Sequence, residues 1–242
     1  MVLGAVIAFF AAFTQAITGF GFALVYAPLL AIVWEVKPAV ATTACLSFVV
    51  NALVLLQVRG HVVTRRLPGL FMGYLAGVGP GLLVLELVSG DVLEVIVGSV
   101  VLLATVALYF QPSIDANEDT LPIRMLAGAF SGASAASTGI GGPPVVLYMI
   151  GRETDVQRFR ATLQAYFLPI SVVTLTLIAL VGRVTEDVLT LAAASVPVMV
   201  LGVALGVWTR PRISPELFRR LVVALLVAMS VMLIGFTVVG VG

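Results

Sequence analysis

Charged residues are scarce in this sequence. Of its 242 residues, 13 are Lys or Arg and 12 are Asp or Glu, together 10%, whereas a soluble domain carries roughly 25% charged residues. Hydrophobic residues make up 61% of the chain, which is more than a soluble domain of this size can enclose. This composition excludes an ordinary soluble enzyme and a disordered chain, and it predicts an all-α polytopic membrane protein.

Cysteine and histidine each occur once, as Cys45 and His61. A single cysteine excludes an intrachain disulfide, and a single histidine excludes a metal site built from several histidines. The net charge of +1 gives no sign of nucleic-acid binding. The His-Glu-x-x-His and Gly-x-Ser-x-Gly patterns are also missing from the sequence. A membrane-embedded enzyme is therefore the weakest function considered, and we expect no cofactor or metal.

Six apolar stretches have the length of a membrane crossing, which needs about 20 residues. They span 38–58, 67–88, 91–110, 160–182, 187–208 and 217–241. No Asp, Glu, Lys or His lies near the centre of any of them. Proton-driven carriers place carboxylates or histidines inside the membrane, so this absence argues against a proton relay.

Two further apolar stretches are too long for one crossing and too short for two. Val2 to Trp34 is 33 residues without a charge before Glu35, and Met125 to Gly151 is 27. As straight helices they would be about 50 Å and 40 Å long. Each is interrupted by glycines, in the runs Thr18-Gly-Phe-Gly21 and Thr138-Gly-Ile-Gly-Gly-Pro-Pro144. We expect the chain to break at both glycine runs.

The two interrupted stretches belong to an internal repeat. The run Thr-Gly-x-Gly recurs at an offset of 120 residues, and further positions match at the same offset, such as Phe10 with Phe130 and Val25 with Val145. The polar segment 111–120 separates the copies. We therefore predict a first repeat at 1–110, a linker at 111–120 and a second repeat at 121–242, each with one broken segment and three transmembrane helices.

The positions of the cations favour one of two topologies. If each broken segment crosses the membrane once, the Lys and Arg residues divide 8 to 5 between the two faces. If each segment is re-entrant, the two repeats are inverted and the division is 11 to 2, with only Lys37 and Arg183 on the poorer face. Because cytoplasmic loops carry the cation excess, we expect the re-entrant, inverted arrangement with both termini outside.

Each break should start a half-helix whose free N–H groups and positive dipole end point toward the protein centre. Two such ends would form a polar site suited to an anion. Pro143 and Pro144 sit where a helix start tolerates proline. The predicted substrate-binding residues are the break residues and the hydroxyls around them: Thr18, Gly19, Phe20, Gly21, Thr42, Thr43, Ser137, Thr138, Gly139, Gly141, Gly142 and Thr162.

For several polar residues the sequence allows either a place on the substrate path or a structural role. Thr42 and Thr162 either face the path or bond a carbonyl of their own helix. The amides Asn51, Gln57 and Gln164 either line the path or bridge two helices. Arg160 is expected to reach the surface rather than the substrate. We interpret the glycines at four-residue spacing as helix-packing faces; they are Gly73, Gly77, Gly81, Gly202 and Gly206.

The repeated Gly-x-Gly turns resemble those of the TauE/SafE sulfite exporter family. The resemblance rests on Ile17-Thr-Gly-Phe-Gly-Phe22, on Ser137-Thr-Gly-Ile-Gly-Gly-Pro-Pro144, and on Lys37-Pro-Ala-Val-Ala-Thr-Thr43 echoed by Arg158-Phe-Arg-Ala-Thr162. It covers essentially the whole chain. One departure is that phenylalanines flank Gly21, where the family often has a fuller glycine run; this would narrow the pocket or make it more apolar.

The resemblance implies a multi-pass permease, in bacteria usually of the inner membrane, that exports sulfite, organosulfonates or related small anions. An anion channel and a carboxylate transporter are the alternatives. The expected partners are a small anionic substrate and the lipid bilayer, with homodimer formation left open and no nucleic acid. An inside-negative membrane potential expels an anion by about 2.3 kcal/mol per charge per 100 mV, so export needs no coupling ion.

Overall fold

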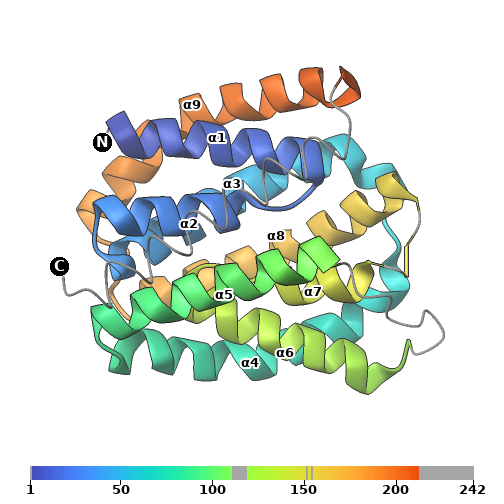
Figure 1. The fold of residues 1–242 in the computed structure, drawn as a ribbon, viewed down its shortest axis with the longest axis horizontal. Helices are drawn as coiled ribbons and strands as arrows, with labels where there is room; N and C mark the ends of the chain where they lie inside the picture. Colours follow the sequence, from blue (N-terminus) through green and yellow to red (C-terminus); the bar gives the residue numbers. More distant parts are fainter. Residues whose placement is uncertain (1, 111–118, 151, 154, 213–242) are drawn as a thin grey trace.

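The computed structural model describes residues 2–110, 119–150, 152–153 and 155–212 (Figure 1). Two expectations fall wholly or partly outside this range: the crossing at 217–241, and the linker at 111–120, of which only Asp119 and Thr120 are described. Every regular element in the described part is a helix. The prediction of an all-α polytopic membrane protein is confirmed.

Five α-helices precede the linker and four follow it within the described residues. The first five are α1 (Val2–Thr18), α2 (Phe22–Val33), α3 (Val36–Val58), α4 (Leu67–Leu87) and α5 (Gly90–Phe110). The others are α6 (Leu121–Thr138), α7 (Gly142–Met149), α8 (Val156–Leu180) and α9 (Glu186–Thr209). Short 3-10 helices at Arg59–His61, Thr64–Arg66 and Arg210–Arg212 cover loop ends.

Four segments in the described range are long and apolar enough to cross a membrane. They are Val36–His61, Thr64–Leu87, Val156–Leu180 and Glu186–Thr209. The apolar helices α1 and α2 are shorter, at 17 and 12 residues, because the glycine run divides their stretch. The second broken segment begins at Leu121, four residues earlier than expected, because Pro122 and Arg124 are accommodated in the first turn of α6.

Glycines cause the two breaks by adopting a backbone conformation that other residues avoid. Gly19 and Gly21 have φ angles of 86° and 105°, and Gly139 has a φ of 76°. A residue with a Cβ atom pays about 1–2 kcal/mol in this left-handed region. The helix restarts at Phe22 in one segment and at Gly142 in the other. The predicted breaks at the two glycine runs are confirmed.

Each broken segment forms a hairpin that returns to the side from which it came. The start of α1, at Leu3 and Gly4, lines the same surface hollow as Leu30 and Trp34 around the end of α2. In Figure 1, α2 accordingly runs back alongside α1.

The second hairpin closes in the same way. Tyr148, near the end of α7, donates a hydrogen bond to Asp119, which lies just before α6. Both segments are therefore re-entrant in shape, as the cation distribution predicted.

Glycines also join the two halves. A Cβ atom on Gly77 or Gly81 of α4 would overlap the backbone of α6 at Ala129 or Ala133. On the opposite flank, a Cβ atom on Gly202 or Gly206 of α9 would also come too close to α1, at the carbonyl of Phe9 or at Ala16 and the carbonyl of Phe13. The first helix of each half therefore packs against the fourth helix of the other half. The interpretation of these glycines as packing faces is confirmed.

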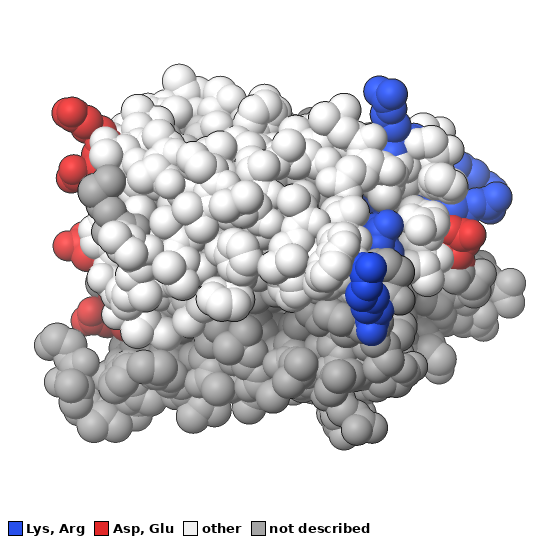
Figure 2. Space-filling model, turned by 90° about the horizontal axis from the view of Figure 1, so that it is seen from above, with Lys and Arg blue, Asp and Glu red and all other residues white. Residues whose placement is uncertain are grey.

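Charged side chains collect at the two ends of the helix bundle. Figure 2 shows Lys and Arg concentrated at one end and most Asp and Glu at the other. The described part of the long flank between them carries only uncharged residues in this view, as expected for a surface that faces lipid tails.

Candidate functional site

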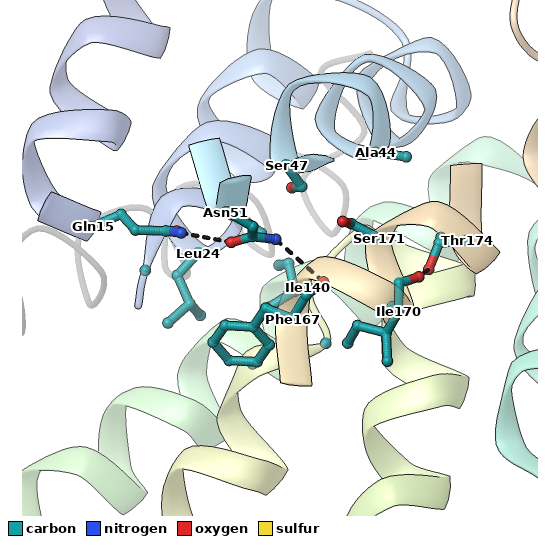
Figure 3. Close-up of a pocket in the computed structure, with 16 residues that line it drawn as sticks. Gln15, Leu24, Ala44, Ser47, Asn51, Ile140, Phe167, Ile170, Ser171 and Thr174 are labelled. Carbon is teal, nitrogen blue, oxygen red and sulfur yellow. Dashed lines mark hydrogen bonds between the residues drawn. The ribbon is translucent and has the colours of Figure 1, made fainter. Parts of the chain in front are cut away.

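A cavity of about 70 Å³ lies where the two breaks meet α3 and α8 (Figure 3). A cavity of this size has room for a small ion or a few waters, since one water needs roughly 10–15 Å³ by the same measure. Both halves of the chain contribute to its wall. The cavity is thus the place where the two hairpins converge inside the bundle.

The break residues provide one part of the wall. Gly21 and the first turn of α2, at Ala23 and Leu24, line the cavity from the first hairpin, and residues 139–142 line it from the second. The first N–H groups of a helix have no partner inside that helix. Two helix N-termini, with their partial positive charges, therefore border one small space.

The long helices α3 and α8 provide the opposite part of the cavity wall. Ala44, Ser47 and Asn51 line the cavity from α3, and Phe167, Ile170, Ser171 and Thr174 line it from α8. Ser47 is the central residue of α3, and Phe167 is next to the centre of α8. The cavity therefore lies near half the height of both helices.

Three buried amides connect the first break to these helices. Gln15 of α1 donates from Nε2 to Asn51 Oδ1 at 2.7 Å and, over a longer 3.5 Å, to Gln164 Oε1. Its Oε1 accepts the backbone N–H of Phe22 at 3.1 Å. Gln164 donates to the carbonyl of Gly19 at 2.7 Å. The amides satisfy backbone groups that the break would otherwise leave unpaired.

Four of the twelve predicted site residues line the cavity: Gly21, Gly139, Gly141 and Gly142. The other eight do not: Thr18, Gly19, Phe20, Thr42, Thr43, Ser137, Thr138 and Thr162. Five hydroxyls among them donate to a carbonyl four residues earlier in their own helix, those of Thr18, Thr42, Thr43, Ser137 and Thr138. The hydroxyl of Thr162 accepts the N–H of Val63. These hydroxyls stabilise helices and a loop.

The structure shows where the three amides and Arg160 lie. Asn51 both lines the cavity and bridges helices, whereas Gln164 bridges them without lining it. Gln57 is exposed and bonds Leu53 of its own helix. Arg160 is half-buried and donates to the carbonyls of Ile17 and Thr18. Arg160 stays part-exposed and does not line the cavity, because the open C-terminal end of α1 holds its guanidinium.

The structure adds residues that the sequence analysis did not select. Gln15, Ser47, Ser171 and Thr174 line the cavity. The repeat offset of 120 could have identified Ser171, because it corresponds to Asn51 and both residues line the cavity. Gln15 carried a second signal, since it is an amide in an otherwise apolar helix.

An ion-pair cluster closes the cation-rich end of the second hairpin. Asp119 accepts hydrogen bonds from Arg124, Arg66 and Tyr148, and Arg66 also donates to the carbonyl of Arg152. Burial raises the pKa of Asp119, but the hydrogen bonds from Arg124, Tyr148 and Arg66 outweigh it and hold that pKa well below its usual range. The cluster ties the start of α4 to both ends of the second hairpin.

The opposite end has its own ion pair. Arg183 binds Glu86 with two parallel hydrogen bonds of 2.8 Å, and Lys37 donates to the backbone carbonyl of Glu86. This pair joins the end of α4 to the loop after α8 and to the start of α3. Among the described residues, no group of three His, Cys, Asp or Glu side chains is arranged to hold a metal ion.

Two hairpins that break at glycines and meet at one cavity are an arrangement typical of membrane transporters. The comparison with protein families agrees: the model described as sulfite exporter TauE/SafE matches residues 4–233. The chain therefore belongs to the TauE/SafE family of membrane transporters for sulfur anions. Comparisons with curated proteins and with solved structures give no match.

Proposed function

We propose that this protein exports a small sulfur oxyanion of the sulfite class through the cavity between the two breaks. The observation that carries the proposal is the convergence of two helix N-termini, those of α2 and α7, on that one cavity. Such termini offer positive partial charge and first-turn N–H donors to an anion, and α7 supplies fewer of these donors than α2 because Pro143 and Pro144 carry no N–H. The residues that line the cavity are all uncharged, so no fixed anion opposes binding.

The cavity has room for a small anion. Its volume of about 70 Å³ is several times the roughly 10–15 Å³ that one water needs by the same measure. Phe20 does not line the cavity, so the narrowing expected from that residue does not apply, although Phe167 contributes one aromatic wall. We propose sulfite as the first substrate to test, with organosulfonates as the alternative.

The proposed transport cycle uses the two halves as inverted units. Residues 1–110 and 121–242 would be the repeats, with the cation-rich end in the cytoplasm and both termini outside. The helix packing supports the assignment of two repeats, because the fourth helix of each half packs on the first helix of the other half: α4 lies on α6, and α9 lies on α1. The Asp119 cluster and the Glu86–Arg183 pair would then close the cavity from opposite faces.

Flux from liposomes tests the proposal. Purified protein is reconstituted into vesicles loaded with sulfite, and a potassium gradient with valinomycin sets the potential. An inside-negative potential should accelerate sulfite efflux relative to protein-free vesicles, and reversing it should slow efflux. Absence of any sulfite flux would refute the transport proposal. Flux that ignores the potential and requires a proton gradient would refute potential-driven export.

A further inference from the structure

We infer that Asn51 selects anions, because the hydrogen-bond network turns its amide nitrogen, and not its oxygen, toward the cavity. The inference rests on the proposed function and specifies which side chain recognises the substrate. Asn51 projects from the middle of α3, is 6% exposed and lines the cavity. An amide can present either a donor or an acceptor, so the orientation decides which charge it favours.

One end of the network is anchored by a backbone donor. The N–H of Phe22 opens α2 and has no partner within that helix. It donates to Gln15 Oε1 at 3.1 Å. A backbone N–H cannot accept a hydrogen bond, so this contact requires the oxygen of Gln15 and directs its NH₂ group away from α2.

The other end is anchored by a backbone acceptor. The carbonyl of Gly19 lies in the first break and accepts Gln164 Nε2 at 2.7 Å. The oxygen of Gln164 then faces Gln15 and can only accept, which is consistent with the contact from Gln15 Nε2 at 3.5 Å. Two independent backbone groups thus demand the same orientation of Gln15.

The orientation of Asn51 follows from that of Gln15. Gln15 Nε2 donates to Asn51 Oδ1 at 2.7 Å, which engages the amide oxygen. The nitrogen therefore points to the other side, toward α8, as Figure 3 shows. One of its two hydrogens makes a long 3.4 Å contact to the carbonyl of Phe167, and the other is available to a ligand. The α3 wall thus offers an N–H donor to the same space as the two helix N-termini.

This arrangement discriminates against cations. A bound cation needs oxygen ligands, yet the Asn51 oxygen is engaged by Gln15 and its nitrogen faces the space. Flipping the amide would set two donors or two acceptors against each other along the buried network. The geometry therefore assigns to Asn51 a role in specificity beyond joining α1 to α3.

The test replaces the donor by an acceptor of nearly the same shape. Asn51→Asp should lower sulfite efflux from liposomes at least about tenfold, mainly by raising KM, since it removes a donor to a charged ligand and adds a like charge. Gln57→Glu is the matched control, because Gln57 lies on the same helix but is exposed and does not line the cavity. It should leave efflux within about twofold of the unmodified protein.

Two further measurements separate recognition from damage. Asn51→Leu removes the donor without adding charge and also leaves Gln15 Nε2 without its acceptor; it should raise KM roughly tenfold, less than Asn51→Asp does. The loss of sulfite efflux caused by Asn51→Asp should also grow from pH 6 to pH 8.5, because both sulfite and the new carboxyl group lose protons over this range. A packing defect would lower the rate equally at both pH values.

The outcomes distinguish the inference from the proposed function. If the unmodified protein conducts sulfite and Asn51→Asp and Asn51→Leu retain its KM, the assignment of Asn51 is wrong and the transport proposal stands. A pH-independent penalty shared by both variants would also overturn the assignment. If the unmodified protein moves no sulfite, the proposed function fails and the assignment falls with it.

Discussion

Gly77 of α4 lies directly against the backbone carbonyl of Ala129 on α6, so close that a Cβ atom on Gly77 would overlap the carbonyl oxygen. The contact has a counterpart in the other half, where Gly202 of α9 meets the backbone of Phe9 on α1. Without a hydrophobic force between helices in lipid, such close approach is a main source of helix association. The two contacts attach the re-entrant hairpins to the crossing helices.

Substitution of Gly77 should therefore separate α4 from α6. Gly77→Ala is expected to lower the free energy of unfolding by about 1–3 kcal/mol, because the methyl group has to displace backbone. Thermal unfolding in detergent measures the change. Gly79→Ala is the control on the same helix, since a Cβ atom there meets nothing within 4 Å. Equal melting temperatures for the two variants would contradict the packing role.

A side chain at the first break should block the cavity. Gly21→Val is expected to abolish sulfite flux, because Gly21 lines the cavity and its Cβ atom would lie 3.3 Å from Thr14 Cγ2. The positive φ of 105° adds backbone strain of about 1–2 kcal/mol. Liposome efflux and a melting curve are measured together.

Gly182→Val separates strain from blockage. Gly182 has a φ of 76°, also in the left-handed region, but it lies in the loop after α8, where a Cβ atom meets nothing within 4 Å. This variant should lose stability and keep its flux per folded protein. If Gly21→Val conducts as well as Gly182→Val does, the cavity is not the substrate path.

The breaks and the packing glycines could be predicted from the sequence because glycine reports directly on backbone geometry. A run such as Thr-Gly-x-Gly inside an overlong apolar stretch disfavours a continuous helix, since glycine is among the poorest helix formers. The hydroxyl positions could not be predicted in the same way. Thr42 and Thr43 belong to the helix that follows the first broken segment, yet both donate to carbonyls of that helix.

Which face of α3 meets the cavity depends on how that helix is rotated in the bundle. In a uniformly apolar helix the spacing of residues says little about that rotation. The sequence therefore did not indicate that Ser47 lines the cavity. Asn51 could be singled out because an amide in an apolar helix must find a partner, and the same reasoning applied to Gln15 would have selected it too.

The proposed topology predicts which residues a membrane-impermeant thiol reagent can reach. Single cysteines at Gly60 and Gln157 lie at the cation-rich end, and single cysteines at Asp91 and Glu186 lie at the other end; all four positions are exposed. In cells expressing a Cys45→Ala background, only the second pair should react from outside. Labelling of Gly60→Cys and Gln157→Cys from opposite faces would refute the arrangement.

The Asp119 cluster should make stability depend on pH in a defined direction. The pKa of Asp119 is lowered in the folded protein, so its contribution is present above the unfolded value of about 3.9 and is lost as pH falls through the folded pKa. Asp119→Asn should cost about 1–3 kcal/mol at pH 7, since Arg66 and Arg124 lose a part-buried partner. The difference in free energy of unfolding between Asp119→Asn and the unmodified protein should stay constant from pH 8 to pH 5 and narrow below about pH 4.

Asp155→Asn is the comparison for this prediction, because Asp155 also has a lowered pKa, from the N–H of Arg158, but is exposed and lies outside the cluster. It should melt much closer to the unmodified protein at pH 7 than Asp119→Asn does. Melting curves at half-unit pH steps measure both variants. A gap for Asp119→Asn that widens on acidification would have the opposite sign to that required by a lowered pKa, and it would exclude the ionised carboxylate as the group that holds Arg66 and Arg124 together.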